Sequence, residues 1–257
     1  MGSLGIKFKQ MKGRPWTRGE LLRVLALYCE IPFGQMHSRN QKVISLAESI
    51  ERTPSSVALK LVNFASFDRG HQVRGVAGMG NTSKLDREIW NEVQADWSLI
   101  VDVSISENSG IDVEEKTWGR ETSAMAITRV RRGQQFFRLC VLSAYDFRCA
   151  LTGIKSLALL RASHIIPWHK REKTRVEPRN GVCLNALHDA AFDRGLVTFD
   201  KELRLVLSSR LKGEMPSQVF GEMFKTYEGR RLNSPQRFAP LHEYFEFHRT
   251  VVFNKNP

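Results

Sequence analysis

The 257-residue sequence has only four cysteines, Cys29, Cys140, Cys149 and Cys183, and no two of them form a CxxC pair. Structural zinc sites and small disulfide-rich folds both depend on closely spaced or regularly paired cysteines. We therefore expect neither a structural zinc nor a disulfide framework. Cysteines used in this way indicate a reducing compartment, the cytoplasm of a bacterial-type cell.

Long apolar runs are also missing. A membrane-spanning helix needs roughly 18 or more consecutive apolar residues, and the longest apolar runs fall far short of that length. The amino-terminal segment MGSLGIKFKQMKGRPW has no apolar core of the kind found in secretory signals. We expect no contact with a membrane. Hydrophobic residues still make up 42% of the chain, enough to bury the core of one large or two small domains.

Acidic residues are too few to balance the basic ones, and the formal net charge is +12. Counting Lys and Arg against Asp and Glu gives +5 for residues 1–100, −4 for 101–122 and +11 for 123–257. A basic excess on both flanking segments favours a polyanionic partner such as nucleic acid. The alternative is an ordinary solvated basic surface, which charge alone does not exclude.

Composition also divides the chain. Residues 101–122 are acidic and rich in turn-forming residues, and they show no helical periodicity, as is typical of a linker. We predict a helical domain over residues 1–100, a linker over 101–122 and a second domain over 123–257. No internal repeat or low-complexity segment is present.

The amino-terminal domain carries clear helix-start signals. Thr17 and Glu20 have the spacing of a capping box, and Thr53-Pro54 combines an N-cap with proline at the first helical position. Helices are predicted from Thr17 to Pro32, over residues 43–50 and over 55–64. Two helices joined by a short turn have the form of a helix-turn-helix or winged-helix-like domain. The alternative is a helical hairpin that does not contact DNA.

If this domain reads DNA, the polar face of its third helix should contact the bases. The loop over residues 67–82 is rich in glycine and has no lysine at the position that a nucleotide-binding loop requires, so no nucleotide cofactor is expected. This loop suits contact with a groove or with the DNA backbone. The predicted DNA-binding residues of this half are Ser55, Ser56, Lys60, Asn63, Arg69 and Arg74.

The most informative stretch runs from residue 149 to residue 193. An apolar, strand-like run leads to His164 and is closed by Pro167. Asn180-Gly181 is a hairpin-type turn signal, followed by alternating apolar residues and then by helical spacing over residues 185–192, which include His188. The pattern predicts a strand, a loop, a second strand and a helix.

These three polar residues suit phosphodiester hydrolysis. An imidazole has an ordinary pKa close to neutral pH and is a suitable general base, so His164 is a candidate for that role. His188 is a candidate ligand for the divalent cation that neutralises charge on the phosphate, and the Asn180 amide can hold the His164 ring by a hydrogen bond. The alternative is that they are ordinary buried histidines and a simple turn.

The order of several short motifs resembles the HNH endonucleases. The motifs are Arg132-Gly133-Gln134 with Phe137-Arg138, Cys149-Ala150-Leu151-Thr152-Gly153, Ala162-Ser163-His164-Ile165, Asn180-Gly181-Val182, and His188 with Phe192-Asp193. The resemblance implies an α+β protein whose helical domain precedes a ββα-metal nuclease domain. It further implies His164 as general base, Asn180 as its orienter, His188 as metal ligand, and one Mg²⁺ or Mn²⁺ per site.

One residue departs from the pattern that the resemblance implies. Many HNH enzymes have Asp or His immediately before the first histidine as a metal ligand, whereas this chain has Ser163. Ser163, a water molecule or a nearby carboxylate, Asp193 or Asp189, fills that position. The predicted metal set is therefore His188, Ser163 and Asp193.

Basic residues lie ahead of this stretch, at residues 129–138, and within it, in the loop between His164 and Asn180. Arginine is suited to bidentate contact with phosphate, and a basic loop beside the predicted site is placed to hold the strand that is cut. A solvated basic face is the alternative. The predicted phosphate-binding residues here are Arg131, Arg132, Lys170, Arg171, Lys173 and Arg175.

These predictions combine into one function. A recognition module ahead of an HNH half resembles the restriction enzymes that depend on DNA modification, including the 5-methylcytosine-requiring BisI type. We expect a homodimer that cuts double-stranded DNA, because one ββα site hydrolyses one strand. The alternatives are an HNH restriction enzyme for unmodified sites and a DNA-binding regulator with a decayed nuclease domain.

Overall fold

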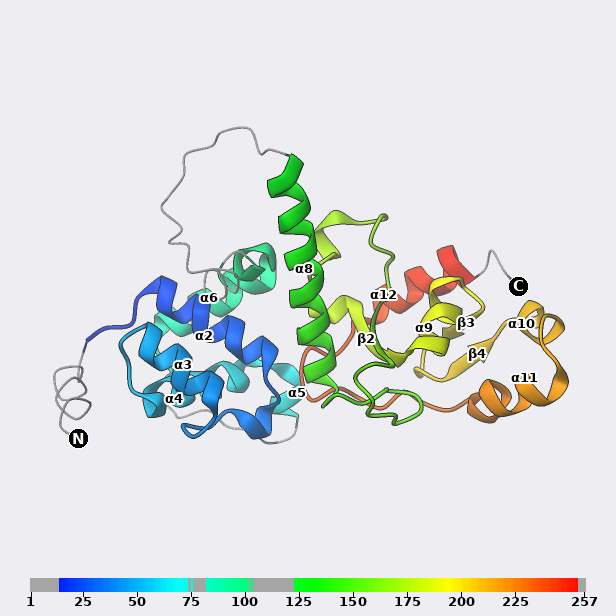
Figure 1. Ribbon diagram of the computed structural model, residues 1–257, viewed down its shortest axis with the longest axis horizontal. Coiled ribbons are helices and arrows are strands. Elements are labelled where there is room, and N and C mark those ends of the chain that lie inside the picture. Colours follow the sequence, from blue (N-terminus) through cyan, green and yellow to red (C-terminus); the bar gives the residue numbers. More distant parts are fainter. Residues whose placement is uncertain (1–13, 74, 76–81, 102, 104–122, 254–257) are drawn as a thin grey trace. The chain divides into compact units, whose positions relative to one another are not determined.

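The computed structural model describes residues 14–73, 75, 82–101, 103 and 123–253, with side chains from residue 129 onward in the last range. The chain divides into two compact units, residues 1–136 and 137–257, each described by itself below. The boundary falls inside the long helix α8 (Ser123–Ala144) (Figure 1). Of the predicted linker over 101–122, only residues 101 and 103 are described.

The amino-terminal unit is helical throughout its described part, as the sequence predicted. In Figure 1, α2, α3, α4 and α6 lie against one another around a core of aliphatic and aromatic side chains. No helix in the described ranges of the chain is both long and apolar enough to cross a membrane. The elements ahead of α8 are α2 (Arg18–Glu30), η2 (Phe33–Gln35), α3 (Gln41–Ser49), α4 (Pro54–Phe67), α5 (Arg69–Gln72) and α6 (Lys84–Ala95).

The predicted helix caps are confirmed. The Thr17 hydroxyl accepts a hydrogen bond from the Glu20 backbone N–H, and the Glu20 carboxylate accepts from the Thr17 N–H at 2.8 Å. Thr53 caps α4, with Pro54 as its first residue. A short polar side chain satisfies backbone N–H groups that have no partner inside the helix, so these positions fix where α2 and α4 begin.

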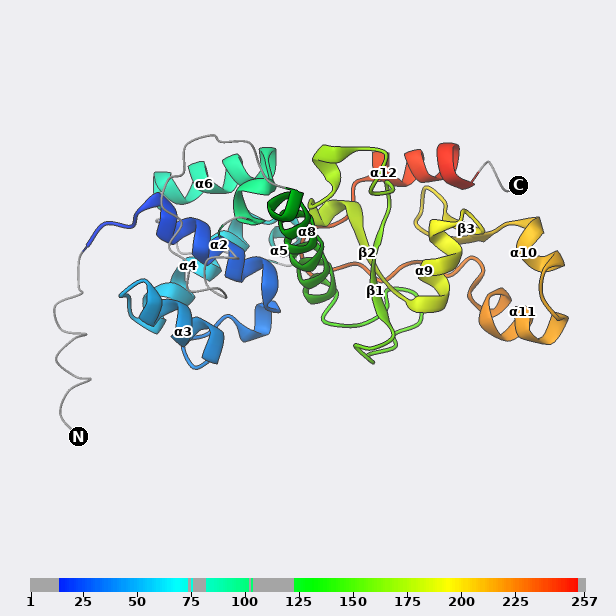
Figure 2. The same cartoon turned by 45° about the horizontal axis from the view of Figure 1, so that its top comes forward.

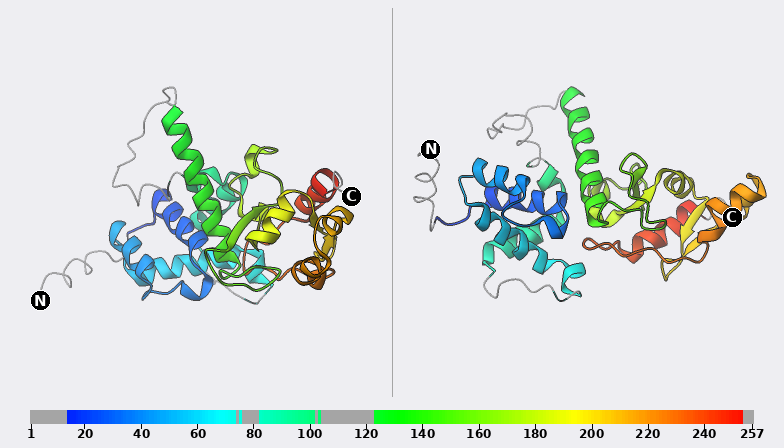
Figure 3. Two further views of the ribbon diagram at one scale, coloured as in Figure 1. Left: turned by 45° about the vertical axis from the view of Figure 1, so that its right-hand side comes forward. Right: turned by 60° about the horizontal axis from the view of Figure 1, so that its bottom comes forward.

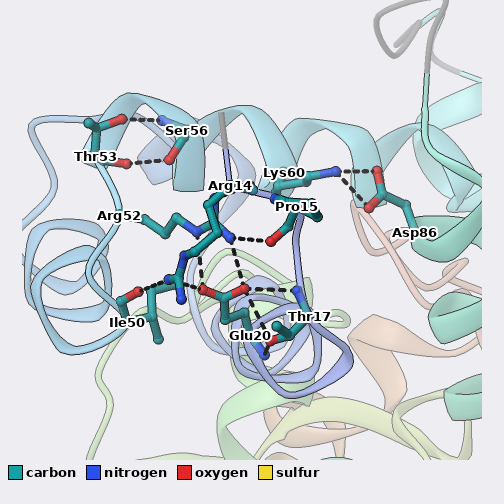
Figure 4. A network of polar contacts seen from close by, with 10 residues as sticks. All are labelled: Arg14, Pro15, Thr17, Glu20, Ile50, Arg52, Thr53, Ser56, Lys60 and Asp86. Atoms are coloured by element: carbon teal, nitrogen blue, oxygen red, sulfur yellow. Dashed lines mark hydrogen bonds and ion pairs between the residues drawn. The ribbon is translucent and has the colours of Figure 1, made fainter. Parts of the chain in front are cut away.

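Glu20 also joins α2 to the segment between α3 and α4. Figure 4 shows Arg14 and Arg52 converging on its carboxylate, at 2.6 Å and 3.0 Å. Burial by itself raises the pKa of Glu20, but hydrogen bonds from Arg52 and Thr17 outweigh that effect and lower the pKa overall. Glu20 therefore stays charged and holds these segments together.

A second buried ion pair changes the role of two residues that we predicted to read bases. Lys60 Nζ donates to both carboxylate oxygens of Asp86, at 2.7 Å and 2.8 Å, and the Asn63 amide donates to one of them at 3.3 Å. All three residues are buried, and Asp86 is completely so. Lys60 and Asn63 therefore face the interior of the unit and join α4 to α6 instead of lying on its surface.

We expect Lys60→Ala to destabilise the amino-terminal unit by about 3–5 kcal/mol, because the Asp86 carboxylate is then buried without its cation. Urea unfolding of the full chain, followed by helical circular dichroism, measures the loss. Ser55→Ala, an exposed change on the same helix, is the control and should cost little. A Lys60→Ala variant with parental stability and weakened DNA binding would restore the base-reading role.

The carboxy-terminal unit contains two separate pairs of antiparallel strands, β1–β2 and β3–β4, with short helices around them. In Figure 2, β1 and β2 lie side by side and α9 lies next to them; Figure 3 shows α10 and α11, in orange, at one end of the unit. Its elements after α8 are β1 (Leu160–His164), η3 (Glu172–Thr174), η4 (Pro178–Asn180), β2 (Gly181–Asn185), α9 (Ala186–Asp193), β3 (Val197–Phe199), β4 (Leu205–Leu207), α10 (Ser209–Gly213), α11 (Ser217–Met223), η5 (Lys225–Tyr227), α12 (His242–Phe247) and η6 (His248–Val252).

The predicted order of strand, loop, strand and helix is confirmed, but Asn180-Gly181 is not a hairpin turn. Residues 165–180 connect β1 to β2, and Asn180 ends η4 while Gly181 already pairs with His164 in the sheet. Gly181 has another function, since a Cβ atom there would lie 2.3 Å from Val141 and 2.9 Å from Phe137. Glycine therefore permits β2 to pack directly against the end of α8.

The four cysteines are buried, and within the described part of the chain none is in a disulfide. Cys149 has a local role in the turn that leads to β1. Its sulfur lies 3.4 Å from the Thr152 backbone nitrogen and 3.3 Å from that of Asn185, so it accepts weak hydrogen bonds from both. This contact attaches the Cys149–Gly153 motif to the end of β2.

Candidate active site

His164 lies at the end of β1, where a backbone carbonyl fixes its tautomer. Its Nε2 is 2.9 Å from the Arg175 carbonyl oxygen, which can only accept a hydrogen bond. Nε2 therefore carries the proton, and Nδ1 of the neutral ring keeps its lone pair. No hydrogen-bond partner for Nδ1 occurs among the described residues. This is the arrangement that a general base requires.

Two aromatic side chains hold the His164 ring. Phe137, at the end of α8, stacks on it with a centroid distance of 3.8 Å and an interplanar angle of 12°. Trp168 contacts it edge-on at 5.5 Å. Burial lowers the pKa of His164, and the hydrogen bond to the Arg175 carbonyl offsets only part of that effect. The ring is therefore neutral at neutral pH and can accept a proton.

Asn180 stabilises the connection between the strands and makes no direct contact with the His164 ring, contrary to our expectation. Its side chain is completely buried, and its oxygen accepts from the Ile166 N–H at 2.8 Å. Its amide nitrogen donates to the carbonyls of Ile166 and Thr174, both at 3.1 Å. Because Thr174 precedes the residue whose carbonyl holds His164, Asn180 positions the base indirectly.

A hydrogen bond between two oxygen-bearing side chains, Ser163 and Asp189, joins β1 to α9. The Ser163 hydroxyl donates to the Asp189 carboxylate at 2.5 Å. Asp193 is four residues further along α9, so the two carboxylates lie on one side of the helix. Two of the alternatives for the position before His164, Ser163 and Asp189, are therefore in contact with each other.

The surroundings of the two carboxylates raise the pKa of both. Burial raises the pKa of Asp189, while the Ser163 hydrogen bond and the charges of nearby arginines oppose the shift. Asp193 keeps exposed surface, but partial removal of water still raises the pKa of its carboxyl group. The negative charge of Asp189 adds to this shift, and the resulting pKa of Asp193 is about 6. No Lys or Arg nitrogen of the described residues lies within 4.0 Å of either carboxylate. Such a pair is suited to a cation.

These residues fit a magnesium or manganese ion. Carboxylate and hydroxyl oxygens are the ligands that Mg²⁺ prefers, and Mg²⁺ usually keeps several water molecules in addition to one or two carboxylates. In the described part of the chain no three His, Cys, Asp or Glu side chains gather into a metal site. The oxygen ligands available to such an ion are those of Ser163 and Asp189, which are in contact, and of Asp193 on the same side of α9.

His188, predicted as a metal ligand, has different surroundings. Its side chain is buried, its Nδ1 lies 3.1 Å from the Asn185 side-chain oxygen, and it packs against the rings of Phe224 and Tyr227. Burial lowers the pKa of His188, and its buried Nε2 has no hydrogen-bond partner among the described residues. Among the described residues, these contacts do not include Ser163 or either carboxylate of α9. They connect α9 to α11 and η5.

The predicted DNA-binding residues occupy several environments. Arg131, Lys170, Arg171 and Lys173 are exposed, and Arg132 is half-buried. Arg175 turns inward, because its Nε donates to the Trp168 carbonyl at 2.9 Å. In the amino-terminal unit Ser55 and Arg69 are exposed, Ser56 is half-buried, and Arg74 lies outside the described residues.

Sequence reasoning did not select two arginines close to the carboxylates, Arg138 at the end of α8 and Arg161 on β1. The charges of both act on Asp189, together with that of Arg194. One signal was available for Arg161. It is two residues from Ser163, and alternate residues of a strand share a face. For Arg138 the signal was its place in the Phe137-Arg138 motif and in the arginine-rich segment over residues 129–138.

Two antiparallel strands followed directly by a helix, with a neutral imidazole at the strand end and two carboxylates on the helix, define a ββα nuclease domain. The model of a family described as HNH endonuclease matches residues 149–200, which include β1, β2 and α9. These residues are an HNH endonuclease domain, and the protein is a phosphodiester hydrolase. HNH nucleases generally use a divalent metal ion. No curated protein matches the chain.

Proposed function

We propose that the protein is a metal-dependent restriction endonuclease that hydrolyses double-stranded DNA. The observation that carries the proposal is the contact of the His164 ring with the Arg175 carbonyl, which leaves Nδ1 as a proton acceptor in the residue that follows Ser163, the partner of Asp189. The net charge of +11 over residues 123–257 supports a polyanionic substrate.

His164 acts on the attacking water. Nδ1 takes a proton from the water as its oxygen bonds to phosphorus, and the bond from phosphorus to the leaving sugar oxygen breaks. The Arg175 carbonyl continues to accept from Nε2 and stabilises the imidazolium that forms. Phe137 and Trp168 prevent the ring from rotating, and Asn180 holds the loop that supplies the carbonyl.

Ser163, Asp189 and Asp193 would hold one Mg²⁺ or Mn²⁺, with Asp189 replacing His188 in the ligand set that the sequence predicted. When bound, such an ion neutralises charge on the phosphate and the leaving oxygen. The Ser163 hydroxyl fixes the orientation of the Asp189 carboxylate before any ion binds. His188 contributes indirectly, because its contacts with Phe224 and Tyr227 set the packing of α9.

We further propose that α3 and α4 act as a helix-turn-helix and that the cleaved sites contain 5-methylcytosine. Ser55 and Leu59 lie four residues apart on α4 and so share one face, and Leu59 is an apolar side chain with 41% of its surface exposed. A 5-methyl group projects into the major groove as the thymine methyl does, where small and apolar side chains contact it. Because Lys60 and Asn63 are buried, they are not part of the surface that we propose to contact the DNA bases. That surface keeps three of the residues predicted from the sequence, Ser55, Ser56 and Arg69.

Cutting both strands requires two active sites. A single ββα site hydrolyses one strand, so we propose a homodimer with two-fold symmetry on a palindromic site. A restriction enzyme for unmodified sites would cut DNA without methylation, and a DNA-binding regulator with a decayed nuclease domain would bind DNA without cutting it. A cleavage assay therefore separates both alternatives from the proposal.

A digestion panel tests the proposal. One plasmid is prepared in unmethylated, cytosine-methylated and hydroxymethylated forms and incubated with Mg²⁺ or Mn²⁺, with chelator as the control. We expect metal-dependent cleavage of the methylated form and little of the unmethylated one. Equal cleavage of all three forms would remove the methylation requirement, and binding without cleavage of any form would favour the regulator.

A further inference from the structure

Two arginines from different elements donate to the same backbone oxygen. Arg138 Nη1, from the end of α8, and Arg161 Nη1, from β1, both lie 2.9 Å from the Leu160 carbonyl oxygen. The two nitrogens are therefore separated by less than the sum of these two distances. Each guanidinium has one more carbonyl contact, Arg138 with Leu157 at 3.3 Å and Arg161 with Ala158 at 3.0 Å.

This arrangement holds two positive charges close together. Like charges repel, and a single carbonyl oxygen carries only a partial negative charge, so the fold gains little from placing both guanidinium groups there. The contacts of Arg161 use only its Nη1 nitrogen, and its side chain is exposed. Among the described residues no carboxylate lies within 4.0 Å of either guanidinium group. Their charge is available to an anion from outside the chain.

The arginine pair lies next to the proposed active site. Arg161 and Ser163 are two residues apart on β1 and share the face of the strand that α9 covers, where Ser163 contacts Asp189. Positive charge from both arginines also reaches Asp189, where it opposes the upward shift of the carboxyl pKa. An anion held by the pair would therefore lie at the start of β1, on the face of the strand that carries the Ser163–Asp189 contact.

We propose that Arg138 and Arg161 form a clamp for a backbone phosphate of the strand that is cut. The inference rests on the proposed nuclease function and names the residues that hold its substrate. Guanidinium groups match phosphate oxygens with pairs of parallel N–H donors, and contacts from backbone carbonyls orient both groups in advance. Contacts with phosphate fix the position of the protein along the DNA but do not distinguish one base sequence from another. They therefore suit an active site whose sequence specificity comes from another part of the chain.

The salt dependence of DNA binding tests the clamp. Arg161→Gln and Arg161→Lys are made in the His164→Ala background, and affinity for a short duplex is measured over a salt series with Mg²⁺ present. Each phosphate contact contributes about 0.9 to the slope of log affinity against log salt. We expect Arg161→Gln to reduce the slope by about that amount and to weaken binding about tenfold. Arg161→Lys keeps the charge, so it should keep the slope while binding more weakly.

Arg204 provides a matched control. It is exposed and also donates to a backbone carbonyl, that of Gly229 at 3.2 Å, but it lies at the β3–β4 pair. Arg204→Gln should leave the slope unchanged. An unchanged slope for Arg161→Gln, or the same change in both variants, would overturn the clamp. A loss of thermal stability without a slope change would assign Arg161 a structural role instead.

This outcome is separable from that of the proposed function. Any duplex reports phosphate contacts, because they do not depend on sequence or methylation. If the parent protein cuts DNA and the Arg161→Gln slope is unchanged, the nuclease stands and the clamp is wrong. If no DNA is cut but the slope falls as expected, the clamp stands as a binding site and the restriction activity is wrong.

Discussion

His164→Ala should reduce metal-dependent DNA cleavage by about 10²–10⁴-fold, the usual contribution of a general base, while changing DNA affinity by no more than a few-fold. The reason is geometric. The only hydrogen bond of the ring within the described structure is to the Arg175 carbonyl, so its free nitrogen is available to water. Single-turnover cleavage of a labelled duplex and equilibrium binding of the same duplex measure the two effects separately.

His242→Ala is the matched control for this experiment. His242 is an exposed histidine of the same unit, at the start of α12. Its loss should leave cleavage near that of the parent. If His164→Ala cuts within a few-fold of the parent, His164 is not the base. If DNA affinity falls as much as cleavage does, the ring contributes to binding and not to water activation.

Local signals in the sequence were sufficient to predict the elements that carry the site. The apolar run before His164, the alternating apolar residues after Gly181 and the helical spacing after Asn185 predicted β1, β2 and α9 in the right order, although the turn expected at Asn180-Gly181 is absent. Capping signals such as Thr17 with Glu20 succeeded for the same reason, because the interacting groups lie within one helical turn of each other.

The errors share a physical cause, which is packing between segments far apart in the sequence. Lys60 and Asn63 are polar, and we assigned them to a surface, but Asp86 on another helix makes a buried position favourable for both. The hydrogen-bond partner of His164 is a backbone carbonyl, so no side chain in the sequence identifies it. A pattern of residue types does not contain this information.

The choice between His188 and Asp189 depends on how α9 is rotated about its axis. Neighbouring residues on a helix point about 100° apart, so only one of the two faces Ser163. Phe192 and Ala191 are buried in the core, and the Asn185 side chain holds the His188 ring, which together fix the rotation. The sequence supplied both candidates, and tertiary packing favours Asp189.

Asp189→Asn and Asp193→Asn should each reduce cleavage by about 10²-fold or more. Each change removes one of the two carboxylates proposed to hold the metal, and the charge stabilisation that a bound ion supplies is several kcal/mol, with about 1.4 kcal/mol for each factor of ten. Raising the Mg²⁺ or Mn²⁺ concentration should restore part of the activity. Cleavage against metal concentration, measured for each variant, gives the apparent metal affinity.

His188 provides the contrasting case, because its contacts are those of a packing residue. His188→Ala should lower the thermal stability, since it removes a buried ring between α9 and the rings of Phe224 and Tyr227. Any accompanying loss of cleavage should not be rescued by added metal. The opposite pattern, metal rescue for His188→Ala and none for Asp189→Asn, would return His188 to the ligand set and exclude Asp189 from it.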